Sequence, residues 1–207
     1  MMLSKRFSKV IIPLVAFFLL FPCVIFAQQK YTVDPTQSTI EGSIKYTLIG
    51  RYKAHFEEFT GGIHFDPQNL TKTSVVLKVK TKSIKSRFPK LDRMVLSPRL
   101  LNAHEFPEMI FESKSIEERN GKYYVTGIFN LRGIKKEMTL PFSIEGPFID
   151  KKGRGYLIAS GKWLINRKAF NFVWNKFLDK GGIIVGNTIT LDWKMMAFRE
   201  NPGPKKK

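Results

Sequence analysis

Apolar and polar residues alternate with a period of two along most of the chain from Tyr31 onward. In residues 39–46, Ile40 and Ile44 share one parity and polar residues take the other. Successive side chains of an extended chain point to opposite faces, so this period predicts strands with one apolar and one solvated face. The same pattern recurs in residues 75–80, 125–131, 138–144 and 189–194. The sequence therefore predicts an all-β fold.

Turn-forming residue pairs separate the predicted strands. Asn120-Gly121 is the clearest, because both residues tolerate the positive φ angles of a type I′ hairpin turn. The other pairs are Asp66-Pro67, Arg132-Gly133, Gly146-Pro147, Lys152-Gly153, Gly181-Gly182 and Gly186-Asn187. A further pair, Gly61-Gly62, falls inside a long predicted strand, from about residue 51 to residue 65, and predicts a bulge or a bend there.

One segment, residues 91–106, has apolar residues at nearly helical spacing. Pro89 and Pro107 bound this segment and Pro98 divides it, so we expect two short helical turns. Many short strands, regular turns and one small helical insertion are typical of an antiparallel barrel or sandwich.

The first 27 residues are typical of a secretory signal peptide. A short basic stretch precedes an uncharged apolar run over residues 10–27. Ala27 and Ile25 suit the small side pockets of a signal peptidase, so cleavage is expected after Ala27. The protein is then expected in the periplasm or outside the cell. Residues 28–199 are expected to form the folded domain, and residues 200–207 a disordered basic tail.

Two other interpretations of the leader stay open. The apolar run approaches the length that spans a bilayer and could remain as an anchor, although two prolines disfavour an unbroken helix. Alternatively, Cys23 could carry a lipid, although Pro22 departs from the small residue that lipidation requires at that position.

The chain is strongly basic, with 35 Lys and Arg against 17 Asp and Glu and a net charge of +18. Such a surface attracts nucleic acid, anionic lipid or acidic polymer. Nucleic acid is not expected, because single strands stack on exposed aromatic residues and the aromatic residues here share the apolar parity. The basic residues are therefore interpreted first as a solvated face, and an anionic membrane surface or envelope polymer is the main functional alternative.

Known catalytic and metal-binding motifs are absent from the sequence. It contains no P-loop, no GxSxG, no HExxH and no cysteine pair, since Cys23 is the only cysteine. A metal site at His55 and His64 would need Glu57 as a third ligand, and His104 lies far away in the sequence. The sequence thus predicts neither a metal site nor an enzyme.

Five stretches of the chain, in the right order, resemble the YceI-like domain family. Residues 125–141 (VTGIFNLRGIKKEMTLP) resemble the hairpin motif of that family. The other matching stretches are residues 31–38 (YTVDPTQS), 56–65 (FEEFTGGIHF), 102–113 (NAHEFPEMIFES) and 165–167 (INR) with Phe170. The chain departs from the family pattern at the helical insertion, where Leu91 and Met94 replace an Arg and a His while Asp92 is kept.

The resemblance implies a lipocalin-like antiparallel barrel of about eight strands with a short helical insertion. It also implies a location in the cell envelope and a long apolar cavity for a polyisoprenoid or another amphiphilic lipid. The expected function is non-catalytic binding of such a lipid, and no cofactor is expected beyond a bound isoprenoid, quinone or fatty-acid-like molecule. The alternative is a basic module that tethers to anionic envelope lipids or polymers.

Two sets of residues are expected to hold the lipid. The cavity is expected to be lined by inward-facing apolar side chains, namely Ile44, Tyr46, Phe56, Phe65, Leu77, Val79, Phe111, Val125, Phe129, Leu131, Phe142 and Trp193. A phosphate or quinone head group is expected near the mouth at Arg132, Lys135 and Arg167. High salt should abolish polymer tethering and leave apolar cavity binding intact.

Overall fold

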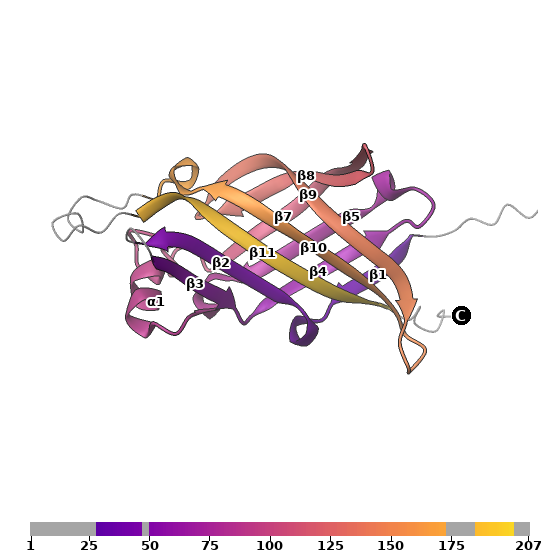
Figure 1. Ribbon diagram of the computed structural model, residues 1–207, viewed down its shortest axis with the longest axis horizontal. Coiled ribbons are helices and arrows are strands. Elements are labelled where there is room, and N and C mark those ends of the chain that lie inside the picture. The colour runs from indigo at the N-terminus through magenta and orange to yellow at the C-terminus, as the bar shows by residue number, and fades with distance from the viewer. Residues whose placement is uncertain (1–27, 47–49, 173–184, 201–207) are drawn as a thin grey trace, which may run out of the picture.

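The computed structural model describes residues 28–46, 50–172 and 185–200 (Figure 1). In these residues, eleven antiparallel strand segments form one sheet that closes on itself through the pairing of β1 with β11. The segments are β1 (Gln29–Val33), β2 (Thr39–Tyr46), β3 (Gly50–Phe56), β4 (Phe59–Phe65), β5 (Ser74–Lys80), β6 (Ile84–Lys85), β7 (Glu108–Arg119), β8 (Lys122–Leu131), β9 (Ile134–Ile149), β10 (Gly155–Asn166) and β11 (Val185–Arg199).

Three strands of the barrel consist of two segments each. The 3₁₀ turn Pro35–Gln37 separates β1 from β2, residues 57–58 separate β3 from β4, and the 3₁₀ turn Thr81–Ser83 separates β5 from β6. Each of these three pairs of segments acts as one bent strand, because both of its segments pair with the two segments of the same neighbour. The strand made of β1 and β2 pairs with the strand made of β4 and β3, and that strand pairs in turn with the strand made of β5 and β6. Counted in this way, the described residues form the predicted lipocalin-like barrel of eight strands.

The interruptions keep their backbone groups hydrogen-bonded. Glu57 N–H donates to the carbonyl oxygen of Ser83 at 3.1 Å, and Lys80 N–H donates to that of Glu58 at 2.9 Å. At the third interruption, the N–H of Met196 in β11 donates to Ser38 Oγ at 2.9 Å. Buried amide groups without partners would destabilise the fold, so these bonds allow the strands to bend without that cost.

Most predicted turns are confirmed. Asn120 and Gly121 have φ angles of 51° and 72°, and Arg132 and Gly133 have 54° and 72°, as type I′ hairpins require. They connect β7 to β8 and β8 to β9. The pairs at residues 66–67 and 152–153 also lie in turns.

Three glycine-containing pairs behave differently from the prediction. Gly146-Pro147 and Gly186-Asn187 do not form turns but lie inside β9 and β11, where extra residues shift the pairing with the neighbouring strand. Conversely, β4 pairs with β5 through Gly61 without a shift, and the long strand is interrupted at residues 57–58 instead. The glycine at 61 provides space, because a Cβ there would lie 2.8 Å from Cγ2 of Val33. The predicted pair Gly181-Gly182 lies outside the described residues.

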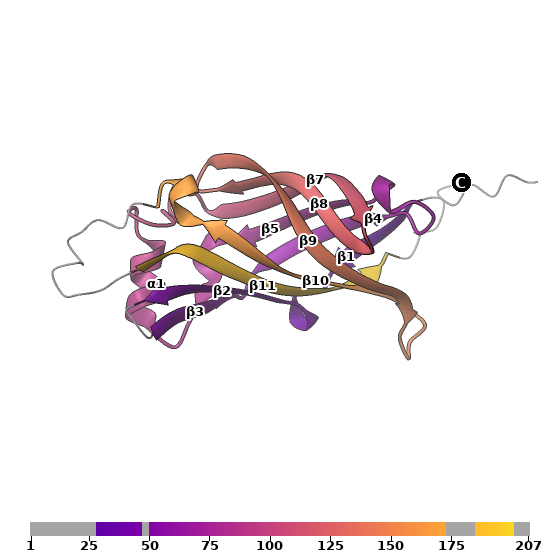
Figure 2. The same cartoon turned by 45° about the horizontal axis from the view of Figure 1, so that its top comes forward.

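The helical insertion contains one helix rather than two. Helix α1 (Pro89–Leu96) begins with proline at its first position and ends before Pro98, after which the chain continues in turns. Figures 1 and 2 show α1 at one end of the barrel, beside the ends of β2 and β3. The start of β1 lies at the opposite end.

The folded part extends one residue beyond the predicted boundary of the domain. The N–H of Glu200, which was expected in the tail, donates to the carbonyl oxygen of Lys30 at 2.8 Å. The two side chains also form an ion pair at 2.9 Å. The rest of the predicted tail and the predicted leader lie outside the described residues. Among the described residues, no helix has both the length and the apolar character needed to cross a membrane.

Candidate functional site

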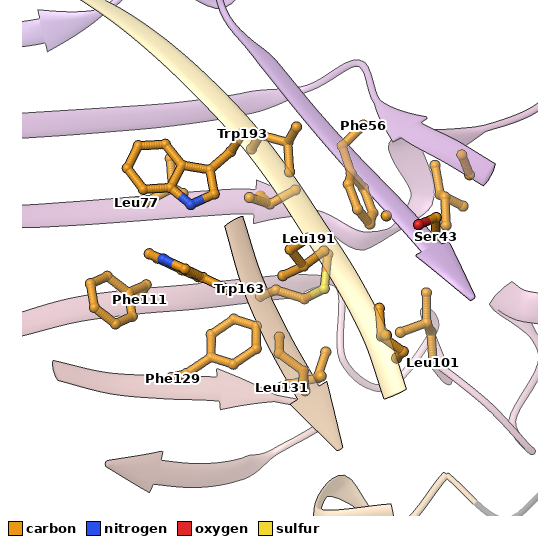
Figure 3. Close-up of a pocket in the computed structure, with 18 of the residues that line it drawn as sticks. Ser43, Phe56, Leu77, Leu101, Phe111, Phe129, Leu131, Trp163, Leu191 and Trp193 are labelled. Atoms are coloured by element: carbon orange, nitrogen blue, oxygen red, sulfur yellow. The ribbon is translucent and has the colours of Figure 1, made fainter. Parts of the chain in front are cut away.

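The inward faces of the strands enclose an apolar cavity. Its volume is about 230 Å³, which exceeds the roughly 150 Å³ of an apolar cavity that holds a benzene molecule. Figure 3 shows side chains from several strands and from the segment after α1 converging on this space. The lining is nearly all hydrocarbon, and its polar side chains are Ser43, Tyr52, Trp163, Arg167 and Trp193. Such a space suits a ligand portion that forms no hydrogen bonds.

The structure places most of the predicted cavity residues in this lining. They are Ile44, Phe56, Leu77, Val79, Phe111, Val125, Phe129, Leu131, Phe142 and Trp193. Phe65 is an exception: it is buried but lies away from the cavity, where its ring packs edge-on against Tyr31 with centroids 5.9 Å apart. The side chain of Tyr46 lies outside what the structure describes. Contact of these residues with a ligand stays a prediction.

The insertion supplies lining residues that the sequence analysis did not assign to the cavity. Leu91, Met94 and Val95 of α1 face the cavity, together with the buried Leu100 and Leu101 that follow. The helical spacing of the first three residues was visible in the sequence and could have identified an apolar helix face. Its position over the end of the barrel depends on tertiary contacts.

An aromatic cluster of Phe111, Trp163 and Trp193 forms one wall of the cavity (Figure 3). The Trp163 ring lies 5.2 Å from the centroids of both other rings. Two glycines leave room for these rings. A Cβ on Gly127 of β8 would lie 2.7 Å from Cζ of Phe111 on the neighbouring β7, and a Cβ on Gly161 of β10 would lie 2.7 Å from Cζ2 of Trp193 on the neighbouring β11. The indole N–H of Trp163 donates to the carbonyl oxygen of Pro141 at 3.1 Å. Packed rings over glycines thus give this wall a defined shape.

Arg167 is the only one of the three predicted head-group residues that reaches the cavity lining. Its guanidinium donates to the carbonyl oxygens of Gly186 at 2.8 Å and Phe172 at 2.9 Å, and to Oδ1 of Asn187 at 3.3 Å. In the described part of the chain no carboxylate pairs with this buried cation, and burial lowers the pKa of its guanidinium from the ordinary value. The positive charge remains, because arginine stays protonated in proteins.

The other two predicted head-group residues do not line the cavity. Arg132 donates from its guanidinium to the carbonyl oxygens of Pro98, at 2.8 Å, and of Asn171. It therefore ties the β8–β9 hairpin to two loops, a role that depends on partners distant in sequence. Lys135 is exposed on β9.

A hydrogen-bonded group centred on Asp92 fixes α1 to the barrel. Its carboxylate accepts from the phenol of Tyr52 in β3 at 2.7 Å, and from the N–H and Oγ of Ser86 at 3.0 and 2.6 Å. Burial raises the pKa of Asp92, but the bonds from Ser86 and Tyr52 outweigh it, so this pKa lies below its ordinary value. The carboxylate is therefore charged, and it holds the apolar face of α1 over the cavity.

The described residues contain no group of three or more side chains that could hold a metal ion. His55 lies on the outer face of β3, where its Nε2 is 3.6 Å from Glu57 of the same strand end. Three of the polar side chains at the cavity, Tyr52, Trp163 and Arg167, are instead hydrogen-bonded to the protein itself. The buried indole N–H of Trp193 has no hydrogen-bond partner among the described residues.

Comparisons with known proteins find a matching family model and a relative of similar length. The family model of the YceI-like domain matches residues 31–197. A UPF0312 protein of Staphylococcus aureus (strain bovine RF122 / ET3-1) is 23% identical over 167 residues, covering 79% of this chain and 94% of that protein.

Two solved structures share the fold at low identity. BcnA of Burkholderia cenocepacia has a TM-score of 0.70 at 21% identity, covering 79% of this chain and 98% of that one. A polyisoprenoid-binding domain from Saccharophagus degradans, implicated in plant cell wall breakdown, has a TM-score of 0.65 at 10% identity, covering 84% of this chain and all of that one.

Proposed function

Because the chain belongs to the YceI-like domain family, we propose that it binds an amphiphilic lipid, with the apolar chain of the lipid in the barrel cavity, and catalyses no reaction on it. An isoprenoid, a quinone or a fatty-acid-like lipid fits this description. The polyisoprenoid-binding domain from S. degradans, which has the same fold, supports the choice of an isoprenoid.

The observation that carries the proposal is the nearly complete absence of polar surface in the cavity lining. A prenyl or acyl chain forms no hydrogen bonds, so it loses none on entering. Burial of such a chain contributes roughly 25 cal/mol per Å² of apolar surface. A polar metabolite of the same size would leave its hydrogen-bonding groups unsatisfied, which costs about 1–3 kcal/mol for each group.

The buried cation of Arg167 supports a polar or anionic head group at the same site. Its positive charge meets only carbonyl and amide oxygens among the described residues. A phosphate, carboxylate or quinone oxygen near this guanidinium would gain a charge-assisted hydrogen bond. Arg167 thus favours an amphiphile over a pure hydrocarbon.

The proposed location is the periplasm or the space outside the cell. The basic and apolar leader over residues 1–27 supports this location. A carrier there would shield an apolar chain from water.

Lipid extraction tests the function directly. The protein, purified without detergent from a bacterium that exports it, should carry a lipid of defined mass in native mass spectrometry. Extraction into organic solvent should release that lipid. If only the mass of the bare chain appears, and added isoprenoids, quinones and fatty acids fail to bind, the proposal is wrong.

A cavity-filling variant provides the sharper test. Phe129→Trp places a larger ring in the cavity and should displace the lipid, with little change in the melting temperature of the lipid-free protein, because the space already exists. The matched control is Phe148→Trp, since Phe148 is 39% exposed at the surface. Retained lipid together with a stability loss of roughly 1–3 kcal/mol would instead indicate an overpacked solid core at this position. Lipid-free protein must be compared, because bound ligand itself raises the apparent stability.

A further inference from the structure

The barrel end that carries α1 exposes a group of cations on its outer surface. Arg87, Lys90 and Arg93 are exposed, and among the described residues none of them has a carboxylate partner. The single acidic residue between positions 82 and 99 is Asp92, whose carboxylate is buried and bonded to Tyr52 and Ser86. The outer side of this segment is therefore positively charged.

Two cations of β3 join the same surface. A surface hollow is lined jointly by Arg51 and Lys53 of β3 and by Arg87 and Phe88, which precede α1. Glu41 also lines this hollow and pairs with Lys53 at 2.9 Å, so one of these charges is compensated. We call Arg51, Lys53, Arg87, Phe88, Lys90 and Arg93 together the α1 patch.

An apolar side chain projects from the α1 patch. Phe88 is 43% exposed, and the exposed Pro89 follows it. The guanidinium of Arg87 lies 5.1 Å from the centroid of the Phe88 ring. An aromatic ring surrounded by cations matches a bilayer surface, where the ring enters the interface and the cations meet anionic head groups. A dissolved anionic polymer would use the cations and leave the ring in water.

The opposite side of the same helix faces the cavity. Leu91, Met94 and Val95 contribute to the lining, while Lys90 and Arg93 point to solvent. Figure 2 shows α1 at the end of the barrel, apart from the β9–β10 turn. One short helix therefore lies between the exposed cations Lys90 and Arg93 and the apolar interior.

We propose that the α1 patch docks on an anionic lipid bilayer and that the lipid ligand passes between the bilayer and the cavity at this end. This inference rests on the proposed function, because it describes how the cavity is loaded. The cations hold the molecule by attraction to anionic head groups. Phe88 sets the docked orientation, with α1 between the membrane and the cavity.

The first test measures binding to vesicles. The purified protein should float with vesicles of phosphatidylglycerol mixed with phosphatidylcholine, but not with phosphatidylcholine alone, and high salt should release it. The double variant Lys90→Gln/Arg93→Gln should weaken binding by about 30-fold, given the attraction per cation near an anionic surface. The control is Lys151→Gln/Lys152→Gln, which removes the same charge from the β9–β10 turn and should change binding little. Equal losses in both double variants would overturn the proposal.

The second test detects which side chain enters the bilayer. In a Cys23→Ser background the whole chain lacks cysteine, so Phe88→Cys provides a single site for an environment-sensitive dye. The dye should shift to the blue on addition of anionic vesicles. Phe148→Cys is the matched control, because Phe148 has a similar exposure of 39% but lies on β9. A dye that reports water at position 88 in the presence of vesicles would contradict the docked orientation.

Two further outcomes separate the possible failures. If the protein binds a soluble anionic polymer as tightly as vesicles, and Phe88→Ser affects neither, then its partner is a polymer and the bilayer proposal is wrong. If vesicle binding fails while native mass spectrometry still shows a bound lipid, the docking proposal fails and the proposed function stands. If the unmodified protein docks as proposed, Lys90→Gln/Arg93→Gln should slow the transfer of a fluorescent isoprenoid from anionic vesicles to the protein. The affinity of the variant for that isoprenoid in detergent should stay unchanged.

Discussion

Single glycines shape the cavity as much as the aromatic residues do. Gly161 lies directly opposite Trp193 in the pairing of β10 with β11, and the indole covers the space that a side chain would fill. The sequence pattern marked Trp193 as inward but contained no sign that its partner had to be glycine, because that requirement appears only in the pairing. Close packing makes such a site intolerant of even one methyl group.

Substitution of this glycine should displace the indole. Gly161→Ala is expected to cost about 1–3 kcal/mol in the free energy of unfolding through overpacking, and to alter tryptophan fluorescence. The matched control is Gly62→Ala, since a Cβ on Gly62 would meet nothing within 4 Å. Urea denaturation measures both variants. Equal stability of the two would show that Trp193 does not occupy the space above Gly161.

Asp92 should make the attachment of α1 depend on pH. Because its pKa in the folded protein lies below the ordinary value, its contribution to stability is present above that ordinary value, and it is lost as the pH falls through the lower one. Asp92→Asn is therefore expected to lower the free energy of unfolding at neutral pH by about 1–3 kcal/mol.

The difference between Asp92→Asn and the unmodified protein should narrow below about pH 4, where an ordinary aspartate takes up its proton. Denaturation with urea at several pH values measures this. Tyr52→Phe removes one of the bonds to Asp92. Its free energy of unfolding should differ less from that of the unmodified protein, and this difference should also narrow at acidic pH. A gap that is constant from neutral to acidic pH would contradict the role of the charged carboxylate.

At the scale of the element, the period of two predicted which side of each strand faces inward but not how far along the barrel a residue lies. Ile63 and Phe65 share one parity on β4, yet Ile63 lines the cavity while Phe65 packs against Tyr31 away from it. The position of a residue along the barrel axis depends on the register and the tilt of the strands, and both are set by the pairing between strands. The three strand interruptions were missed for a similar reason, since their backbone partners lie on neighbouring strands.

The β8–β9 hairpin combines a conformational requirement with a packing requirement. Gly133 has a φ of 72°, and a Cβ there would lie 2.6 Å from Cε1 of Phe106. Gly133→Val is expected to cost on the order of 1–3 kcal/mol through backbone strain alone, and more through the contact. Gly121→Val is the control, because Gly121 has the same φ and a Cβ there would meet nothing within 4 Å. The melting temperatures of the two variants are compared. An equal decrease in both would show that the contact with Phe106 does not contribute to the loss of stability.

At the scale of the whole molecule, the barrel and its closure were predicted from strands, turns and family resemblance together. The place of α1 over one end was not, because it depends on the bond between Asp92 and Tyr52, which lies 40 residues earlier on β3. The residue Tyr52, which anchors Asp92, has an ordinary inward parity in the sequence. Its hydroxyl contact with the insertion, 2.7 Å to Asp92, exists only in the folded barrel.

The N-terminal residue of the expressed protein tests its cellular location. Expressed with its own leader in a bacterium, the protein should begin at Gln28 and appear in the envelope fraction, because a signal peptidase is expected to cleave after Ala27. N-terminal sequencing and fractionation measure this. A chain that still begins at Met1 and resists extraction from membranes at alkaline pH would replace the signal peptide with an anchor.

The two ends of the described chain meet at the barrel end opposite to α1, where Tyr31 pairs with Arg199 and Lys30 holds Glu200. Tension applied to these ends would pull two adjacent antiparallel strands apart from their shared extremity. The hydrogen bonds between β1 and β11 would then break one after another from that end, rather than carrying the load together in shear. Under such a pull, the seam that closes the barrel would open first. Such a pull begins at the end of the molecule farthest from the helix.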